Sequence, residues 1–492
     1  MPFCKSTFMG ITMFCLFAFG DSILSTRNFK RHERERRAEL SVSGQADSLQ
    51  CIANGRDGRD GRDGKDGRDG QNGAKGEKGE PCNCNKEGEI QVETLKQEIT
   101  SNRMQLEHLQ SKVVQLKTQV SMWKADPFSS STEKELRQCG DIQYARKITS
   151  IPARYDYRAE TFEIDGSFYV MVVSYHDVSK YGIDSIIYSF DGNALEIYQS
   201  VPTDGAIDAK YFEINGQRYL AIAQHYGDRT SLGYGVNSQI LKWRNKRFEH
   251  IQSLPTKGAF SVAHFNVEND TFIAFANYYD SSSYSLNSHV YKWRSGQFVL
   301  FQSIPSLGAF SIKHFQIGNL HFIVIAHHYT GSTYNTDSKI YLWSGAQFEI
   351  FQSIPTFGAH DVETFTSNQF TFILFANYYN QNTKSNNIDS IVYIWNGVKF
   401  EEFQSIASKG ATDFQAFSAC DKTYVAIANH YDGSSGEISS VIYNVNGAGL
   451  QPYQHITVAN IIRWSAFTYG NSTYLFAGPN TTKLSYLFKW AG

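Results

Sequence analysis

The chain has 492 residues, too many for one compact core, so more than one structural unit is expected. Hydrophobic residues make up 41% of the chain and aromatic residues 14%, which is enough for at least one large folded domain. The formal net charge of −2 gives no overall electrostatic reason to expect nucleic acid or an anionic membrane as a partner.

The first 25 residues predict a secretory signal peptide. Lys5 provides the positive n-region, and residues 11–20 form an apolar stretch that is too short to span a bilayer. A signal anchor is the alternative. No later segment approaches 18 uninterrupted apolar residues, so we expect no transmembrane segment and a protein secreted to the extracellular space or matrix.

Residues 26–54 are expected to form a basic linker or a propeptide. The tetrapeptide at residues 34–37 has the sequence Arg-Glu-Arg-Arg and resembles a furin-type processing site, with cleavage after Arg37. The alternative is a solvated basic linker that is not cleaved.

Residues 55–81 carry glycine at every third position, in nine consecutive Gly-X-Y triplets. Only glycine fits the crowded axis of a collagen triple helix, so this segment predicts three chains wound together. Pro81 is the only proline among the triplets, and exposed ion pairs between the many Arg, Lys and Asp residues contribute ~0–1 kcal/mol each. We therefore expect this triple helix to need support from neighbouring segments.

Two neighbouring features are suited to give that support. Cys51 precedes the triplets and Cys82 and Cys84 follow them, which predicts inter-chain disulfides of unspecified connectivity in an oxidising compartment. Residues 88–123 predict a coiled coil, and its heptad seam contains Val92, Leu95, Ile99, Asn102, Leu106, Leu109, Val113, Leu116, Val120 and Trp123. The alternative is an amphipathic helix packed on the following domain, but the upstream triplets favour a homotrimer.

After a polar linker at residues 124–140, residues 141–492 contain a repeat. The stretches FQSIPTFGAHDVETF, FQSIPSLGAFSIKHF and IQSLPTKGAFSVAHF begin at residues 351, 301 and 251, and similar stretches recur every 50 to 53 residues. Their second residue is Gln199, Gln252, Gln302, Gln352, Gln404 and Gln454, with Thr149 at the first occurrence. A period near 50 without helical signals is typical of β-propellers.

Each period contains four alternating segments, which predict four strands; in one period these are residues 260–267, 271–279, 288–293 and 297–305. The first three segments occur seven times, but the fourth follows only six of them. Residues 145–152 supply the missing strand, as expected when the N-terminal strand completes the last blade and leaves no free edge. The sequence therefore predicts an all-β, seven-bladed propeller.

The repeated Gly and Trp positions have predicted structural roles. Glycines after each fourth strand allow a tight passage from the rim to the channel: Gly205, Gly258, Gly308, Gly358 and Gly410. Aromatic residues in the third strand are expected to fill space between blades: Phe190, Trp243, Trp293, Trp343, Trp395 and Trp490.

The pattern FIAFANYY, SHVYKW and FQSIPT.GA.D resembles the EAR repeat, also called EPTP. This repeat forms seven-bladed propellers in a family that includes the leucine-rich glioma-inactivated proteins and the thrombospondin-type laminin G domain and EAR repeat protein. The resemblance covers roughly residues 141–492. It implies a secreted, non-enzymatic propeller that binds cell-surface or matrix proteins. The leucine-rich repeats and laminin G domain of those relatives are replaced here by collagen-like and coiled-coil segments.

One row of innermost-strand residues is expected to line the channel: Arg158, Asp208, Ser261, Ser311, Asp361, Asp413 and Arg463. The resemblance implies a metal ion in the channel, and Asp208, Asp361 and Asp413 would offer the oxygen ligands that Ca²⁺ prefers. Alternatively, Arg158 and Arg463 neutralise the carboxylates directly.

No catalytic motif is evident, and no enzymatic activity or firm cofactor is expected. His225, His328 and His430 recur at equivalent places in different blades, so they are expected to be structural rather than to form one zinc site. The loops between the second and third strands vary in length and sequence, which favours a binding role over plain solvated turns.

Three N-glycosylation sequons fall where the repeat predicts turns, at Asn269, Asn471 and Asn480. Cys139 and Cys420 are the remaining cysteines beyond the signal segment, and a disulfide between them would clamp the ring closure. Taken together, the sequence predicts a protein-binding propeller on a trimeric stalk that acts in adhesion or signalling at the cell surface or in the extracellular matrix. The alternatives are a glycan-binding, collagen-stalked lectin-like trimer and a structural matrix component.

Overall fold

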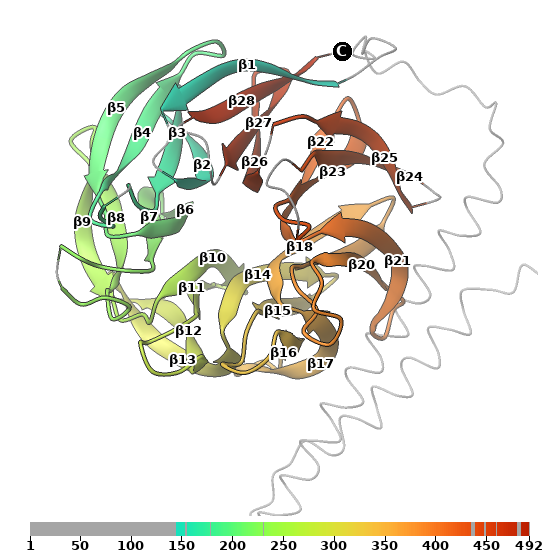
Figure 1. Cartoon of the computed structure of the whole chain (residues 1–492). Coiled ribbons are helices and arrows are strands. Elements are labelled where there is room, and N and C mark those ends of the chain that lie inside the picture. The colour runs from blue at the N-terminus through green and yellow to red at the C-terminus, as the bar shows by residue number, and fades with distance from the viewer. Residues whose placement is uncertain are drawn as a thin grey trace, which may run out of the picture. The chain divides into compact units, whose positions relative to one another are not determined.

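The computed structural model describes residues 144–491 except 153–154, 178, 230, 434–437, 447–448, 459 and 480–483. The following predictions lie outside these residues: the signal peptide, cleavage after Arg37, the collagen-like and coiled-coil segments, Cys51, Cys82, Cys84, Cys139 and Asn480. The described residues form seven four-stranded antiparallel sheets arranged in a ring, shown in Figure 1. The predicted seven-bladed propeller is confirmed.

The strands follow the chain from blade to blade, with the first strand of each blade at the channel and the fourth at the rim. Their bounds in blades 1 to 3 are β2 (Asp156–Ile164), β3 (Ser167–Ser174), β4 (Asp184–Phe190), β5 (Leu195–Pro202); β6 (Ala206–Ile214), β7 (Gln217–Gln224), β8 (Ser238–Arg244), β9 (Arg247–Leu254); and β10 (Ala259–Val267), β11 (Asp270–Asn277), β12 (Ser285–Arg294), β13 (Gln297–Leu307). Blades 4 and 5 contain β14 (Ala309–Ile317), β15 (Leu320–His327), β16 (Asn335–Trp343), β17 (Phe348–Phe357); and β18 (Ala359–Ser367), β19 (Phe370–Asn377), β20 (Asn387–Trp395), β21 (Phe400–Lys409). Blades 6 and 7 contain β22 (Ala411–Ala419), β23 (Lys422–Asn429), β24 (Ser440–Asn446), β25 (Gly449–Ile456); and β26 (Ile461–Tyr469), β27 (Ser472–Pro479), β28 (Leu484–Ala491), β1 (Tyr144–Pro152).

The ring is closed by β1, which pairs antiparallel with β28 from Tyr144↔Ala491 to Pro152↔Leu484. The predicted closing strand at residues 145–152 is thus confirmed, and it is one residue longer at its N-terminal end. Ile151 of β1 is buried in a cluster shared with blades 7 and 1. The N-terminal strand therefore removes the free edge of blade 7 and contributes to the core on its far side.

The recurring glutamine clamps neighbouring rim strands together. In blade 3 the Gln302 amide donates to Phe348 O at 2.8 Å and accepts from Phe348 N at 2.9 Å. Such a pair reproduces the two hydrogen bonds of a β-ladder between strands that belong to different sheets. The same clamp joins Gln199 to Phe248, Gln252 to Phe298, Gln352 to Phe400, Gln404 to Leu450 and Gln454 to Ala145.

A bulge in each rim strand explains how glutamine reaches the next blade. In β13 the register shifts between the pairs Val290↔Gln302 and Tyr291↔Leu300, so Phe301 is the extra residue. A bulge bends the strand and redirects the side chains beside it. The junction of blades 7 and 1 has Thr149 at the glutamine position, and there the Tyr474 hydroxyl donates to Gly192 O at 3.0 Å.

The hydrophobic core lies between successive blades rather than in one place. The predicted aromatic slot is confirmed: Trp343 of blade 4 packs on Phe272 of blade 3 with ring centroids 5.9 Å apart. Trp490 likewise lies 4.5 Å from Tyr424 of the preceding blade. Each blade therefore buries one face of its sheet against the next, and closure of the ring completes the last of these interfaces.

The repeated glycines turn the chain from the rim to the channel. At Gly308 φ is +49°, and an added Cβ would lie 2.4 Å from Tyr329 O. The Gly308 amide donates to Tyr284 O at 2.7 Å, which fixes the crossing against the preceding loop. All five repeated glycines have φ between +49° and +58°, as the predicted tight passage requires.

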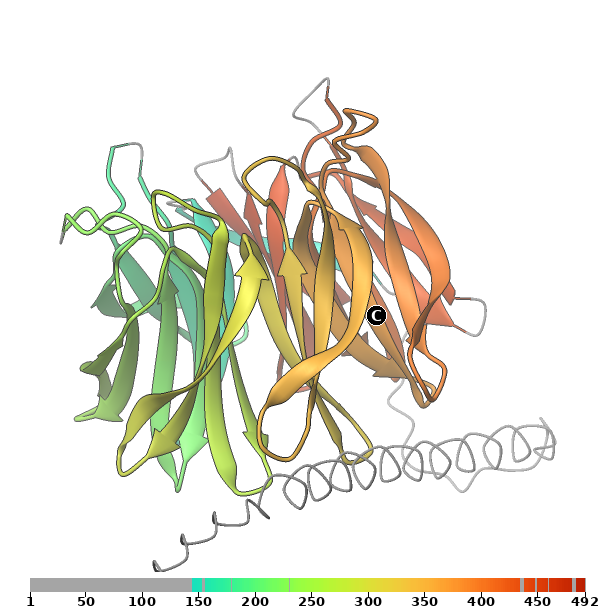
Figure 2. The same ribbon diagram turned by 90° about the horizontal axis from the view of Figure 1, so that it is seen from below.

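The strand order gives the propeller two different faces. We call the face with the loops between second and third strands, and with the rim-to-channel crossings, the loop face. The turns between first and second strands and between third and fourth strands form the opposite turn face, at the bottom of Figure 2. Both Tyr144 and Ala491 lie at the turn face, because β1 enters there and β28 ends there.

Candidate functional site

The loop face carries an unbroken row of tyrosines across blades 1 to 5, which we call the tyrosine arc. Each tyrosine ring contacts the next, with centroid distances between 4.4 and 5.3 Å. All eight side chains are half-buried. The members in order are Tyr181, Tyr226, Tyr234, Tyr279, Tyr284, Tyr329, Tyr334 and Tyr379.

The arc alternates between two sources. Tyr226, Tyr279, Tyr329 and Tyr379 follow the second strands of blades 2 to 5, whereas Tyr181, Tyr234, Tyr284 and Tyr334 come from the loops of blades 1 to 4. A loop tyrosine bridges its own blade and the next: Tyr284 lies 4.4 Å from Tyr279 and 5.0 Å from Tyr329. The arc therefore joins the loops of five blades into one continuous surface.

Polar side chains hold these loops in shape. Asp280 Oδ1 accepts from the Ser282 hydroxyl at 2.7 Å and from the amides of Ser282 and Ser283, both at 2.9 Å, and these bonds lower the pKa of Asp280. Asp177, Thr330 and Asn380 form similar turns in blades 1, 4 and 5. Loops with such local bonds present their side chains in a defined arrangement.

Inside the arc, an aromatic cluster surrounds the mouth of the channel. Phe260 stacks on Phe310 with centroids 3.8 Å apart, and His360 lies 4.5 Å from Phe310. His225 and His328 each bond through Nδ1 to the carbonyl of a repeated glycine, at 3.1 Å. Their rings pack on aromatic neighbours rather than on one another, as the sequence analysis expected of structural histidines.

We expect buried histidines to make the fold sensitive to acid. Burial, helped by Lys210, lowers the pKa of His264 to about 4, and its Nε2 has no hydrogen-bond partner among the described residues. In the unfolded chain this histidine has a pKa near 6.5, so between pH 6.5 and 4 the unfolded state binds more protons than the folded state. The stability of the fold is therefore full above about pH 6.5 and falls as the pH decreases toward 4. At about pH 4 this shift in the pKa of His264 corresponds to a loss of on the order of 3 kcal/mol in the free energy of unfolding.

Replacing His264 with tyrosine should reduce this acid sensitivity. Tyr211 holds the equivalent position in blade 2 and stacks on Phe162 at 4.9 Å, as His264 stacks on Phe212 at 4.6 Å. We expect His264→Tyr to lose less thermal stability than wild type between about pH 7 and about pH 5. The measurement is Tm against pH, with exposed His250→Tyr as the control. An unchanged slope for His264→Tyr would show that this histidine does not carry the effect.

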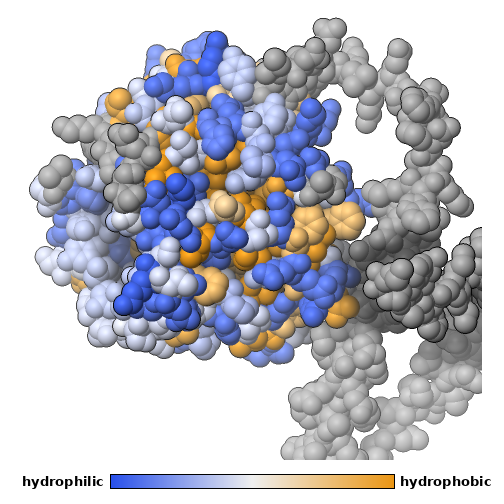
Figure 3. All heavy atoms as spheres, turned by 45° about the vertical axis from the view of Figure 1, so that its right-hand side comes forward, coloured by the Kyte–Doolittle hydropathy of each residue, from blue (hydrophilic) through white to orange (hydrophobic). Residues whose placement is uncertain are grey.

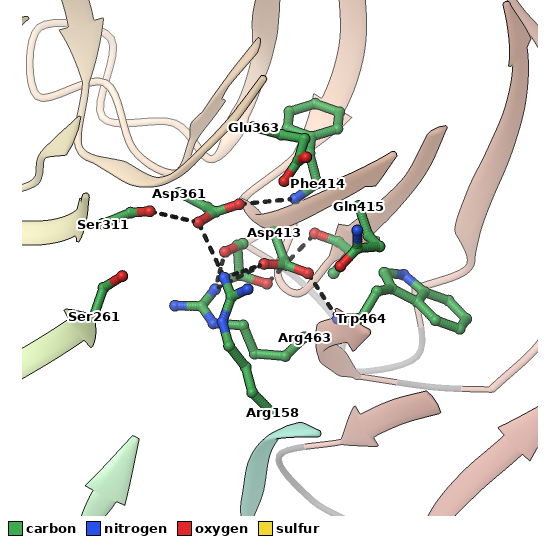
Figure 4. A network of polar contacts seen from close by, with 12 residues as sticks. Arg158, Ser261, Ser311, Asp361, Glu363, Asp413, Phe414, Gln415, Arg463 and Trp464 are labelled. Atoms are coloured by element: carbon green, nitrogen blue, oxygen red, sulfur yellow. Dashed lines mark hydrogen bonds and ion pairs between the residues drawn. The ribbon is translucent and has the colours of Figure 1, made fainter. Parts of the chain in front are cut away.

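Three aspartates of the predicted channel row face the guanidinium of Arg158, and Figure 4 shows this for Asp361 and Asp413. Arg158 Nη2 donates to Asp413 Oδ1 at 2.8 Å and to Asp361 Oδ1 at 3.1 Å. Its Nε lies 4.0 Å from Asp208 Oδ1. Arg463 Nη1 lies 3.9 Å from Asp413 Oδ1 and donates to the carbonyls of Thr412 and Ile462. Each acidic residue in the row therefore faces an arginine.

Backbone amides and serines engage the same carboxylates. Asp413 Oδ2 accepts from Trp464 N at 2.7 Å, and Asp361 accepts from Ser311 Oγ at 2.8 Å and from Phe414 N at 3.4 Å. Asp208 Oδ2 accepts from Ser261 Oγ at 3.1 Å and from Val262 N at 3.0 Å. These bonds tie each acidic residue to the innermost strand of an adjacent blade.

The channel charges perturb one another. Burial would raise the pKa of Asp361, but Arg158 and Lys313 hold it below its usual value. Burial raises the pKa of Asp413 to about 7 despite the opposing effect of Arg158. Two residues further along the inner strands lie two more ion pairs, Lys313–Glu363 at 2.6 Å and Lys210–Glu160 at 3.1 Å. The sequence analysis missed this second row, although it follows from the same alternation.

The three aspartates do not fit a channel metal as they stand. Ca²⁺ needs six to eight oxygen ligands at about 2.3–2.6 Å. Here the guanidinium of Arg158 faces one oxygen of each carboxylate, in the place that a cation would take. Among the described residues no group of three His, Cys, Asp or Glu side chains is arranged to hold a metal ion. The structure therefore shows the ion-pair alternative.

The EPTP domain family matches residues 196–244, 247–294, 297–344, 347–396 and 399–444. Each match begins with the rim strand of one blade and ends with the third strand of the next, so the family unit is offset from the blade by one strand. The chain belongs to the EPTP-repeat family. This confirms the resemblance drawn from the repeat motif.

Individual relatives match only part of this EPTP-repeat chain. The human thrombospondin-type laminin G domain and EAR repeat-containing protein is 29% identical over 138 residues, which are 27% of this chain and 20% of that protein. Human leucine-rich repeat LGI family member 2 is 24% identical over 130 residues, 26% of this chain and 21% of that protein. The matched part thus spans about a fifth of these relatives.

A Bacteroides uniformis protein of known structure, provisionally assigned as a 6-phosphogluconolactonase, has a TM-score of 0.48 and 12% identity, covering 63% of this chain and 88% of that one. A likeness this distant implies no shared activity.

The remaining predicted sites fall at the turn face where they are described. Asn269 and Asn471 are exposed in the turns between the first and second strands of blades 3 and 7. Cys420 lies in the equivalent turn of blade 6 with φ of +49°, and it is disulfide-bonded. The described residues contain no helix that could cross a membrane.

Proposed function

We propose that this chain is a secreted, non-enzymatic propeller that binds an extracellular or cell-surface protein through its loop face. The tyrosine arc carries this proposal. Tyrosine offers a large, amphipathic contact area at a small cost in side-chain entropy, and it is enriched in protein interfaces. Eight half-buried tyrosines in continuous contact, on loops held by local hydrogen bonds, form a pre-ordered surface that needs little reorganisation on binding.

The arrangement of the two faces supports the same choice. Tyr144 and Ala491 lie on the turn face, where Asn269 and Asn471 also lie. Glycans at these asparagines would lie on the face opposite the tyrosine arc. Figure 3 shows hydrophobic residues interspersed among hydrophilic ones on the side that it presents, a mixture common in interfaces between soluble proteins.

Substitution of central arc residues should weaken cell-surface binding. We expect the double variant Tyr284→Ser/Tyr329→Ser, made in the secreted full chain, to bind cultured cells at least about tenfold more weakly, because tyrosines at interface centres often contribute 2 kcal/mol or more. Tyr453→Ser, on the exposed rim of blade 6, is the matched control. Flow cytometry measures binding, and Tm confirms folding. Equal binding by the arc variant and wild type would contradict the proposal.

The same assay separates a protein partner from a glycan. A protein partner is lost when the cells are treated with protease and is retained after glycosidase treatment. Neighbouring rings of the arc contact one another edge to face, so part of the aromatic surface that a sugar could stack on is already covered. Loss of binding after glycosidase treatment alone would favour the lectin-like alternative.

We further propose that the chain is a homotrimer, so that three loop faces act together and weak single contacts add up to avidity. The Gly-X-Y triplets at residues 55–81 and the heptads at residues 88–123 support this proposal. Light scattering of the secreted protein, with and without reductant, should give the mass of three chains. A mass of one chain would contradict the trimer, and these segments would then act only as a linker.

A further inference from the structure

The channel of the propeller contains three aspartates whose carboxylates face one arginine side chain. Asp208, Asp361 and Asp413 come from blades 2, 5 and 6, and their carboxylates face the guanidinium of Arg158 from blade 1. Figure 4 shows this for Asp361 and Asp413. We infer that Arg158 is a built-in replacement for a channel metal ion. The propeller then closes without a divalent cation, and removal of this one side chain exposes a site for Ca²⁺.

The contacts of Arg158 match those that a bound cation would make. Its Nη2 contacts Asp361 and Asp413 together, at 3.1 and 2.8 Å, and its Nε faces Asp208 at 4.0 Å. A guanidinium can engage several carboxylates at once through its planar set of donors. One side chain thereby links blade 1 to blades 2, 5 and 6, including two blades that do not adjoin it in the ring.

Burial of the three carboxylates favours a positive charge at this place. The carboxylates of Asp361 and Asp413 are fully buried and that of Asp208 is 11% exposed. Buried carboxylates that lose their partner are strongly destabilising, because nothing replaces their lost hydration. Arg463 contributes a second positive charge, but its Nη1 donates to the carbonyls of Thr412 and Ile462 and is 3.9 Å from Asp413. Arg158 is therefore the main counter-charge of the three aspartates.

Without Arg158, the same residues offer a set of ligands suited to a hard divalent cation. Three carboxylates provide up to six oxygens, and Ca²⁺ binds six to eight oxygens. The hydroxyls of Ser311 and Ser261 already contact Asp361 and Asp208 at 2.8 and 3.1 Å, so further oxygens lie beside the carboxylates. Backbone amides of Val262, Phe414 and Trp464 hold the carboxylates in position independently of Arg158.

The test compares the secreted full chain in EDTA and in CaCl₂. Wild type should show the same Tm in both, whereas Arg158→Ser should be less stable than wild type in EDTA and regain several degrees in CaCl₂. Tb³⁺ should bind Arg158→Ser and give luminescence sensitised by Trp464, whose amide bonds to Asp413. The double variant Arg158→Ser/Asp361→Asn should lose both responses. Arg218→Ser, which removes a surface ion pair to Asp165, is the matched control and should respond to neither ion.

Two results would overturn the inference. One is a Ca²⁺-dependent rise in the Tm of wild type that Asp361→Asn abolishes, because the metal would then displace the guanidinium. The other is an Arg158→Ser protein that folds but takes up neither Ca²⁺ nor Tb³⁺. If Arg158→Ser is not secreted, the test uses wild type and Arg158→Lys instead. The lysine variant keeps the positive charge. Neither should respond to Ca²⁺, and a response in either contradicts the inference. All readouts are independent of partner binding.

Discussion

A chain that starts at residue 153 is expected to fail to fold into a closed propeller. Removal of β1 leaves the edge of β28 unpaired, takes Ile151 from its buried cluster and deprives Gln454 of both bonds to Ala145. The lost ladder and buried area correspond to on the order of 5 kcal/mol or more, a large fraction of the stability of most domains. The exposed edge should also promote aggregation.

The yield of soluble protein after refolding and size-exclusion chromatography measure this effect. The matched control is a chain that starts at residue 138, which lacks the upstream segments but keeps β1 and Cys139. A synthetic peptide with the sequence of residues 144–152 should restore a monodisperse product if it is added during refolding. A monomeric, cooperatively unfolding protein without β1 would show that closure by this strand is not required.

Gly308→Ala is expected to destabilise the propeller by about 2–4 kcal/mol. The new Cβ would meet Tyr329 O at 2.4 Å, and φ at this position is +49°, so strain from the backbone and from overpacking adds together. The residue belongs to the crossing between blades 3 and 4, directly beneath Tyr284 and Tyr329 of the tyrosine arc. Its replacement should therefore also disturb the loop face.

Gly318→Ala separates the two causes. Gly318 has φ of +58° in an exposed turn, and an added Cβ there would have nothing within 4 Å. It should cost only the backbone strain of about 1–2 kcal/mol. Denaturant unfolding of both variants gives the comparison, and equal losses at the two positions would mean that the close approach to Tyr329 O does not matter.

Much of the fold could be predicted from the repeat because equivalent residues make equivalent packing contacts in successive blades. The count of strands placed β1 in blade 7, and the positions of Gly308 and Trp343 predicted a tight crossing and an inter-blade contact. Strand bounds were less accurate: the expected segment at residues 288–293 begins earlier, at Ser285, because its pairing with β13 continues to Ser285↔Leu307. The ends of a strand that pair outside its alternating hydrophobic segment cannot be recognised from the sequence pattern.

The site was harder to predict than the fold. The recurrence of Gln302 and its equivalents was visible, but a role in clamping rim strands depends on a bulge that the pattern does not show. The tyrosine arc was missed because its members come from two sources with irregular spacing: Tyr284 lies five positions after Tyr279, but Tyr234 lies eight positions after Tyr226. Only the folded loops bring them into one row. In the channel, the sequence left open whether Arg158 or a metal faces the aspartates.

A single added glycan tests most directly whether the loop face binds the partner. Asp280→Asn creates an Asn-Ser-Ser sequon in the loop of blade 3 and keeps the oxygen that accepts from Ser282 and Ser283. We expect the glycosylated variant to lose cell-surface binding. Asp280→Asn/Ser282→Ala, which lacks the sequon, should bind, as should Thr271→Ala, which removes the turn-face sequon at Asn269. Undiminished binding by a chain glycosylated at residue 280 would contradict the account.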